Sequence, residues 1–170
     1  MKTNVVLIGM PSCGKSTVGV LLAKQLGYRF LDCDLLIQES EGRLLHELIA
    51  IHGIEGFLAI EDRINAAIDA THTVISTGGS AVYGRAAMEH LCAIGTVVYL
   101  KIDYQTLERR LGDYSHRGVV LPAGYTLRDL YRERTALYEK YADITVDERD
   151  TEGNLAKTVE LCTRMLAIPS

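Results

Sequence analysis

The feature that most constrains this chain is a glycine-rich signature close to its N-terminus. Residues 9–16 read G-M-P-S-C-G-K-S, which is a complete G-x-x-x-x-G-K-[ST] pattern. An apolar stretch, residues 4–8, precedes the signature, and an amphipathic segment, residues 15–26, follows it. Glycines in that context let the backbone turn so that successive N–H groups face one anion at the positive end of a helix. The pattern predicts a phosphate-binding loop, and the alternative is a glycine-rich turn carrying a solvated lysine.

Residues of this loop match the chemistry of a bound nucleoside triphosphate. Lys15 supplies a positive charge for the β- and γ-phosphates, and the hydroxyl of Ser16 is suited to bind Mg²⁺. The other residues that we assign to nucleotide binding in this loop are Gly9, Ser12, Cys13, Gly14 and Thr17. The chain is therefore predicted to bind ATP together with Mg²⁺.

Strand and helix signals alternate along the chain. Short apolar or β-branched stretches predict strands over residues 4–8, 28–32, 73–76, 96–102 and 144–146. Helical spacing covers residues 15–26, 44–51, 56–70, 85–91, 104–111, 127–141 and 154–166. This alternation predicts an α/β fold with a parallel sheet flanked by helices. No repeat or flexible linker interrupts residues 1–170, so we expect a single domain.

Composition narrows the classes of partner. The net charge of −4 argues against nucleic-acid binding. The sequence contains no run of 18 apolar residues, so we expect no membrane-spanning helix. The four cysteines are widely spaced and form no C-x-x-C pair, which favours reduced thiols over disulfides or a metal site. We expect a cytoplasmic monomer that acts on a small molecule.

Two acidic residues lie where the second predicted strand ends. Asp32 and Asp34 would project to one face if the extended backbone continued through them. The carboxyl ends of strands in an open α/β sheet form the ligand-binding edge. One acid could then position Mg²⁺, and the other could orient an attacking hydroxyl. The alternative is that Asp34 caps the helix that begins beside it.

Arginines are concentrated in one part of the chain. Six of the twelve lie between residues 109 and 134, which is typical of a protein that handles a small, highly charged anion. Arg134 falls within an apolar helical stripe, so it needs either an internal acid such as Glu61 or a ligand anion. Arg117 stands in residues 112–124, a stretch without periodicity that we interpret as a lid closing over the transferred phosphate. Either Arg109 or Arg110 could face a nucleotide base.

A glycine turn follows the third predicted strand. Gly78 and Gly79 would expose backbone N–H groups that can bind hydroxyls or carboxylates. A plain connection between strand and helix is the alternative.

Taken together, these residues resemble the shikimate kinase family of P-loop small-molecule kinases. The matching features, in chain order, are residues 9–16, Asp32-x-Asp34, Gly42-Arg43, Phe57 with Glu61, residues 77–79, Arg109-Arg110, Arg117, Arg134-x-x-x-Tyr138 and Ala142-Asp143. The P-loop alone is shared by many NTPases, but its combination with the other motifs is much more specific. The resemblance implies a three-layer fold with a five-stranded parallel sheet in the order 2-3-1-4-5.

The resemblance also implies roles for individual residues. In that family the acid matching Asp32 helps place Mg²⁺, and the acid matching Asp34 contacts the hydroxyls of the substrate. The glycine turn and the arginine matching Arg134 hold the substrate as well. The arginine matching Arg110 lies near the adenine, and the lid arginine matching Arg117 reaches the phosphates. For catalysis we therefore single out Lys15, Asp34 and Arg117.

The chain departs from the family pattern on the substrate side. Leu58 stands where an arginine usually binds the carboxylate of the substrate. Ile54 replaces an acid, Ser80 replaces the third glycine of G-G-G, and Gly118 replaces a proline. A charged hydrogen bond contributes about 1.5–3 kcal/mol, so losing the arginine should weaken carboxylate binding roughly 10–150-fold unless something compensates.

These observations predict a kinase that transfers a phosphoryl group from ATP to a hydroxyl of a small hydroxylated acid. Shikimate is the leading acceptor, by resemblance. Another hydroxy acid or a hydroxy amino acid is the first alternative, because Leu58 replaces the expected arginine. A nucleotide-binding regulatory module is the second, although such a module has little need of both aspartates. A nucleic-acid-dependent P-loop protein is disfavoured by the acidic charge.

Overall fold

The computed structural model describes residues 2–112, 119 and 121–166 of the 170-residue chain. Its strands are β1 (Asn4–Ile8), β2 (Arg29–Asp32), β3 (Thr73–Ser76), β4 (Gly95–Lys101) and β5 (Ile144–Asp147). Its helices are α1 (Lys15–Leu26), α2 (Cys33–Glu41), α3 (Leu45–Ala66), α4 (Arg85–Ile94), α5 (Tyr104–Leu111), α6 (Leu127–Tyr141) and α7 (Leu155–Leu166). Two short 3-10 turns, η1 (Ala81–Tyr83) and η3 (Glu148–Thr151), complete the described elements.

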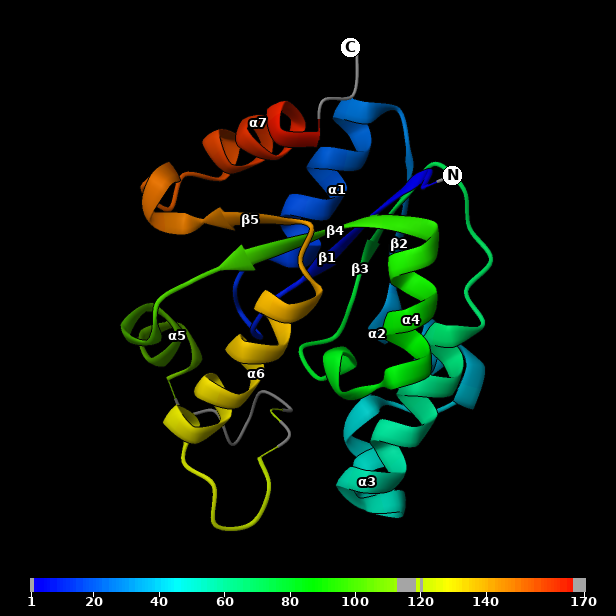
Figure 1. Ribbon diagram of the computed structural model, residues 1–170. Helices are drawn as coiled ribbons and strands as arrows, with labels where there is room; N and C mark the ends of the chain where they lie inside the picture. The colour runs from blue at the N-terminus through cyan, green and yellow to red at the C-terminus, as the bar shows by residue number, and fades with distance from the viewer. Residues whose placement is uncertain (1, 113–118, 120, 167–170) are drawn as a thin grey trace.

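The five strands form one parallel sheet in the order β2-β3-β1-β4-β5. All five residues of β1 are buried, as a central strand with helices on both faces requires. Helices α1 and α7 pack together against one face, and α4 and α6 contact β4 from the other (Figure 1). The predicted three-layer α/β fold and its strand order are confirmed.

The main core lies on both faces of the sheet, and a smaller apolar cluster lies beside it. The smaller cluster joins Ile37 of α2 to Leu48, Phe57 and Ile64 of α3. Figure 1 shows α3 beside α4, and α3 also contacts α2 and η1. This second cluster therefore fixes the helices that border the substrate side of the strand ends.

The prediction of two helices over residues 44–51 and 56–70 agrees with the structure. The segment α3 consists of two helical stretches that meet at a kink, where Gly53 has a non-helical backbone with a φ of 69°. Glycine adopts a positive φ without the steric cost that a Cβ imposes. The helix α2 entered the sequence analysis only as the alternative reading of Asp34, and the structure shows that it forms.

The structure also bears on the expectations for the lid, the cysteines and a membrane span. The proposed lid, residues 112–124, falls partly outside the described residues, and Arg117 and Gly118 lie in the part that is not described. All four cysteines are free thiols in the structure. Among the described residues, no helix is long and apolar enough to cross a membrane.

Candidate active site

The glycine-rich loop connects the end of β1 to the start of α1. Gly9 has a φ of 151°, and a Cβ at this position would lie 2.7 Å from the backbone oxygen of Leu100 in β4. The loop therefore needs glycine where it passes the neighbouring strand. Gly14, with a φ of 94°, is the N-cap of α1, and Ser12 also adopts a left-handed conformation with a φ of 63°. The turn thus ends at the N-terminus of a twelve-residue helix, a position that attracts anions.

Lys15 is held inside this loop. Its Nζ donates hydrogen bonds to the backbone oxygens of Gly9 at 2.8 Å and Met10 at 2.9 Å. The side chain is buried although it carries a charge, so these carbonyls replace part of its hydration. The ammonium group is consequently fixed at the centre of the turn, where a phosphate bound by the loop would meet it.

At the end of β2, the carboxylate of Asp32 accepts hydrogen bonds from the start of α2 and from a side chain of α1. Its Oδ1 accepts hydrogen bonds from the backbone N–H groups of Asp34 at 2.9 Å and Leu35 at 3.3 Å, which makes Asp32 the N-cap of α2. Its Oδ2 accepts a hydrogen bond from Ser16 Oγ at 3.1 Å. One carboxylate oxygen thus starts the helix, while the other faces the hydroxyl at the start of α1.

The expectation that Asp32 and Asp34 share one face of a continuing strand is wrong. The strand ends at Asp32, and Asp34 already belongs to the first turn of α2. The capping residue is Asp32 rather than Asp34, so the capping alternative applied to the wrong carboxylate. Asp34 points instead toward the glycine turn, because a Cβ added to Gly78 would lie 2.9 Å from its Oδ1.

Burial and two neighbouring charges act on the carboxyl group of Asp34. The side chain is partly withdrawn from water, and this desolvation raises the pKa of the carboxyl group. The negative charge of Asp32 raises that pKa further, whereas the positive charge of Lys15 lowers it. The two acids and the lysine are therefore close enough for each to influence the others.

The glycine turn after β3 is anchored from two sides. Thr77 bonds to the backbone oxygen of Leu7 in β1 through both its N–H, at 3.1 Å, and its Oγ1, at 2.8 Å. The hydroxyl of Tyr138 in α6 donates to the backbone oxygen of Gly79 at 2.6 Å. Helix α6 and strand β1 together hold the turn against the phosphate-binding loop. Side chains at Gly78 and Gly79 would collide with their surroundings, so both glycines are needed for this close approach.

A buried carboxylate lies directly behind the turn. Glu61 of α3 is 2% exposed, and its Oε2 accepts a hydrogen bond from Ser80 Oγ at 2.6 Å. Among the residues that the structure describes, its Oε1 has no hydrogen-bond partner, and it lies 2.7 Å from the position that a Cβ of Gly78 would occupy. Burial raises the pKa of Glu61 to about 7, although the Ser80 hydrogen bond and the charge of Arg134 lower it.

Arg134 is buried at the opposite side of the turn. It is 2% exposed, and a Cβ on Gly79 would lie 3.0 Å from its Nη1. Its guanidinium carbon is 5.5 Å from the ring centroid of Tyr83. Glu61 and Arg134 influence each other electrostatically, but no ion pair joins them within the described part of the chain. A direct salt bridge to Glu61, one of the two partners that we expected for Arg134, is therefore not present between these two residues.

A separate cavity opens on the other side of the loop, at the ends of β4 and β5. Its volume is about 280 Å³, and its walls include Ser12, Gly14, Val18, Leu100, Arg110 and Val146. Arg110 donates from Nη1 to the backbone oxygen of Ser12 at 3.3 Å and forms an ion pair with Glu148. Arg109 does not line this cavity and is exposed. Of the two candidate arginines, Arg110 is thus the one beside the loop.

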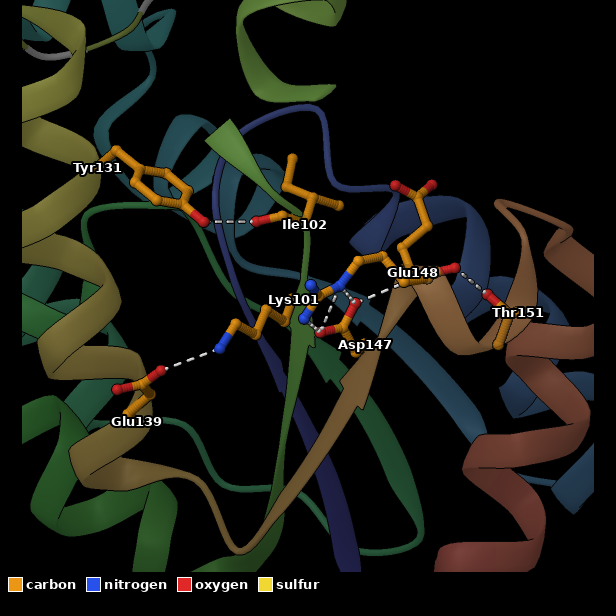
Figure 2. Close-up of polar contacts among 8 residues, drawn as sticks. Lys101, Ile102, Tyr131, Glu139, Asp147, Glu148 and Thr151 are labelled. Carbon is orange, nitrogen blue, oxygen red and sulfur yellow. Dashed lines mark hydrogen bonds and ion pairs between the residues drawn. The ribbon is translucent and has the colours of Figure 1, made fainter. Parts of the chain in front are cut away.

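The residues after β5 shape this cavity. Figure 2 shows Thr151 beside the backbone of Glu148, to whose oxygen it donates a hydrogen bond of 3.1 Å. Asp147 accepts a hydrogen bond from the backbone N–H of Arg149 at 3.0 Å and thereby caps η3. These contacts fix the turn from which Glu148 reaches Arg110.

The cavities follow one another along the strand ends. The 280 Å³ cavity shares Ser12 and Gly14 with a second one, of about 320 Å³, that contains Lys15, Ser16 and Thr17. The second shares Asp34, Gly78 and Gly79 with a third, of about 140 Å³, that Arg134 also lines. This succession can hold a nucleoside, its phosphates and an acceptor in line, with Asp34 at the junction of the last two.

Several known proteins with similar sequences are named shikimate kinase. The family model described as Shikimate kinase matches residues 11–164. The chain belongs to the shikimate kinase family. A shikimate kinase of Nostoc punctiforme is 38% identical over 161 residues, which cover 92% of this chain and 88% of that protein. A shikimate kinase of Mycobacterium avium is 40% identical over 152 residues, covering 86% and 85% respectively.

Solved structures of this family have the same architecture. The shikimate kinase of Acinetobacter baumannii in complex with shikimate superposes with a TM-score of 0.80 at 28% identity, covering 98% of this chain and 92% of that one. The enzyme of Aquifex aeolicus also gives 0.80 at 28% identity, covering 96% and 95%. A sugar kinase of Janibacter, at 17% identity and a TM-score of 0.63, shares the fold alone.

Some residues of this shikimate kinase family member were not anticipated from its sequence. Glu148 became visible only in the structure, because it acts on a position far away in the chain. Tyr138 was part of the R-x-x-x-Y motif of the resemblance, but the hydrogen bond from its Oη to the glycine turn was not anticipated. The structure brings the loop, both aspartates, the glycine turn, Arg110 and Arg134 to one edge of the sheet. Arg117 lies outside the described residues.

Proposed function

We propose that this protein transfers the γ-phosphoryl group of ATP to a hydroxyl group of shikimate. The observation that carries the proposal is the position of Asp34, which lines both the cavity of the phosphate-binding loop and the cavity of Arg134. Family membership supports the use of ATP and an alcohol acceptor. The glycine turn, Gly78 and Gly79, separates the two cavities and would leave room for a small acceptor only.

In this reaction the acceptor oxygen forms a bond to the γ-phosphorus while the bond from that phosphorus to the bridging oxygen breaks. ADP departs with the bridging oxygen, and the proton of the acceptor hydroxyl passes to the carboxylate of Asp34. Before the transfer, Asp34 accepts a hydrogen bond from that hydroxyl and orients it in line with the bond that breaks. Lys15 and the N–H groups of the loop stabilise the negative charge of the phosphates. Arg117 would add a further positive charge from the lid.

The donor set at the strand end fits Mg²⁺. Ser16 Oγ and Asp32 Oδ2 are hard oxygen atoms only 3.1 Å apart, beside the loop that would hold the phosphates. Mg²⁺ is bound in proteins by one or two such groups together with water and phosphate oxygens. We assign Ser16 and Asp32 to the metal, which when bound neutralises negative charge on the β- and γ-phosphates. No group of three or more potential ligands from His, Cys, Asp and Glu occurs among the described residues, so a cage made entirely of protein is not indicated.

We assign the nucleoside to the cavity of Arg110 and the carboxylate of the acceptor to Arg134. The first cavity is partly apolar, through Val18, Leu100 and Val146, which suits the faces of a base. A buried guanidinium such as that of Arg134 binds a carboxylate through charge-assisted hydrogen bonds. Leu58 provides no second cation at this end, and this observation keeps other hydroxylated acids as the second candidate.

The test is ADP release from ATP in the presence of Mg²⁺ and shikimate, with quinate and two hydroxy amino acids as parallel acceptors. The product is identified by the phosphorus resonance of a new phosphate monoester. Shikimate-dependent release supports the proposal, whereas release only with another acceptor would move the assignment to that compound. ADP release that no acceptor stimulates would contradict a kinase of this class.

A further inference from the structure

A fourth cavity continues the succession beyond Arg134. It has a volume of about 370 Å³ and lies between α3, η1, α6 and the residues before α6. Its apolar walls are formed by Ile54, Leu58, Tyr83, Pro122, Ala123 and Leu130. We call these six residues and the space they enclose the apolar compartment. The catalytic steps described above do not use it.

Arg134 connects the apolar compartment to the acceptor cavity. It lines both spaces, with Nη1 beside Gly79 on one side and the guanidinium carbon 5.5 Å from the Tyr83 ring on the other. Asp34 lines the acceptor cavity but not the compartment. An acceptor whose reacting hydroxyl lies at Asp34 and whose carboxyl end lies at Arg134 would therefore point that end toward the compartment.

Charges on the wall restrict what can enter. Glu133 and Glu55 are the acidic residues that line the compartment. Both oxygens of Glu133 accept hydrogen bonds, from Tyr83 Oη at 2.6 Å and from Tyr125 Oη at 3.0 Å. Burial and the neighbouring Glu133 raise the pKa of Tyr83 to about 12, so its ring presents a neutral surface. A second anionic group would be repelled here, whereas an uncharged apolar group would be accommodated.

Leu58 determines the character of this space. Its side chain is half-buried and also packs against the small cluster around Phe57 and Leu48. An arginine at this position would bring a guanidinium and its hydration to the wall, beside the guanidinium of Arg134. With leucine, Arg134 is the cation that this wall offers to a carboxyl group, and the space beyond is apolar.

We propose that the apolar compartment is a substrate subsite, and that this kinase binds hydroxylated acceptors whose end opposite the reacting hydroxyl carries an uncharged alkyl or ring group. This inference rests on the proposed function, because it places the acceptor between Asp34 and Arg134. Leu58 is the specificity-determining residue of the subsite. Shikimate itself would bind through Arg134 and leave the apolar walls without contact.

A series of shikimic acid amides measures the subsite directly. The primary amide, the N-methylamide and the N-propylamide have the same uncharged head and differ only in alkyl length. Each methylene buried in an apolar site should tighten binding by roughly fourfold. We therefore expect the dissociation constant of the propylamide to be at least about tenfold lower than that of the primary amide. Titration calorimetry in the presence of ADP and Mg²⁺ gives these constants without requiring turnover.

Two variants and one control localise the effect. Ile54→Trp fills the compartment and should make the binding constant independent of alkyl length. Leu58→Arg should weaken propylamide binding and tighten shikimate binding by about tenfold, through an added charged hydrogen bond. Ile51→Arg places the same kind of change on an exposed position of α3, 56% accessible, and should leave the series unchanged.

The outcomes separate this inference from the proposed function. Shikimate turnover with no dependence of binding on alkyl length would overturn the subsite and leave the kinase assignment intact. A steep dependence on alkyl length without shikimate turnover would support the subsite and contradict shikimate as the acceptor. The same dependence persisting in Ile54→Trp would place the alkyl group elsewhere and also overturn the proposal.

Discussion

Ser80 donates a hydrogen bond of 2.6 Å to Glu61, and both side chains are buried behind the glycine turn. By the family resemblance, Ser80 stands where glycine is usual and Leu58 stands where arginine is usual, and Leu58 precedes Glu61 by three residues in α3. The hydrogen bond from Ser80 and the positive charge of Arg134 lower the pKa of Glu61, but they do not offset the effect of burial. Burial therefore raises the pKa of Glu61 to about 7, next to the cavity that we assign to an acidic acceptor.

Replacing Lys15 by alanine should remove activity without unfolding the protein. The ammonium group is fixed at the centre of the loop by two backbone oxygens, where it meets phosphate charge. We expect turnover to fall by about a hundredfold or more, as for other groups that stabilise transition-state charge. Lys24→Ala, at an exposed position of the same helix, is the matched control. Steady-state kinetics and circular dichroism check both variants, and normal turnover in Lys15→Ala would contradict the role.

Asp34→Asn and Asp32→Asn should affect different steps. Asparagine at position 34 retains the size of the side chain but accepts a weaker hydrogen bond from the hydroxyl of the acceptor. Turnover should therefore fall about a hundredfold, with little change in the KM for ATP. Asparagine at position 32 still caps α2 well, because Asn and Asp are equally good N-caps. Its main effect should be a higher Mg²⁺ concentration for half-maximal activity. Equal losses of ATP binding in both variants would refute this division of roles.

Arg110→Ala should weaken ATP binding while leaving acceptor binding unchanged. Arg110 lines the nucleoside cavity and contacts the backbone of Ser12, so its guanidinium is placed to stack on a base. Loss of such a stacking contact should raise the KM for ATP by about fivefold. Arg109→Ala, at the adjacent exposed position, is the control. If both variants behave alike, the effect is one of general surface charge.

The sequence was sufficient for the layers of the fold, because the hydrophobic patterns that define them are local. The strands and helices alternate, and the shikimate kinase resemblance supplied the strand order that the structure confirms. The start of α2 depends on the two capping hydrogen bonds that Asp32 accepts, which periodicity does not reveal. The division of α3 into two helical stretches at Gly53 was predictable, because both stretches carry their own local helical pattern.

The site was predictable where a motif carries the chemistry within one segment, as in residues 9–16. It was less predictable where residues distant in the chain meet. The pairing of Arg110 with Glu148 spans 38 positions, and that of Ser80 with Glu61 spans 19. The departure at Leu58 was visible in the sequence, but the apolar compartment that it lines is formed by residues of α3, η1 and α6 that are distant in the chain.

Protonation of Glu61 should make stability depend on pH. Burial raises its pKa from 4.5 to about 7, so the folded protein binds this proton more tightly than the unfolded chain does. The free energy of unfolding should therefore fall as the pH rises from 4.5 to about 7. In Glu61→Gln this contribution is absent. Urea unfolding of both proteins across this range measures the difference, and parallel profiles would show that Glu61 does not titrate there.

The same group should make the binding of acidic acceptors weaken at high pH. When Glu61 is ionised, its negative charge near Arg134 and Asp34 opposes a carboxylate in the acceptor cavity. We expect the KM for shikimate to rise by about fivefold between about pH 6 and about pH 8, with a smaller change in kcat. The KM of Glu61→Gln should stay nearly constant, because its side chain has the same shape and no charge to gain. The primary amide of shikimic acid, which carries no carboxylate, should show little dependence on pH even with the unmodified protein. An equal rise for the acid and the amide would assign the effect to another group, since only the acid experiences the charge of Glu61 directly.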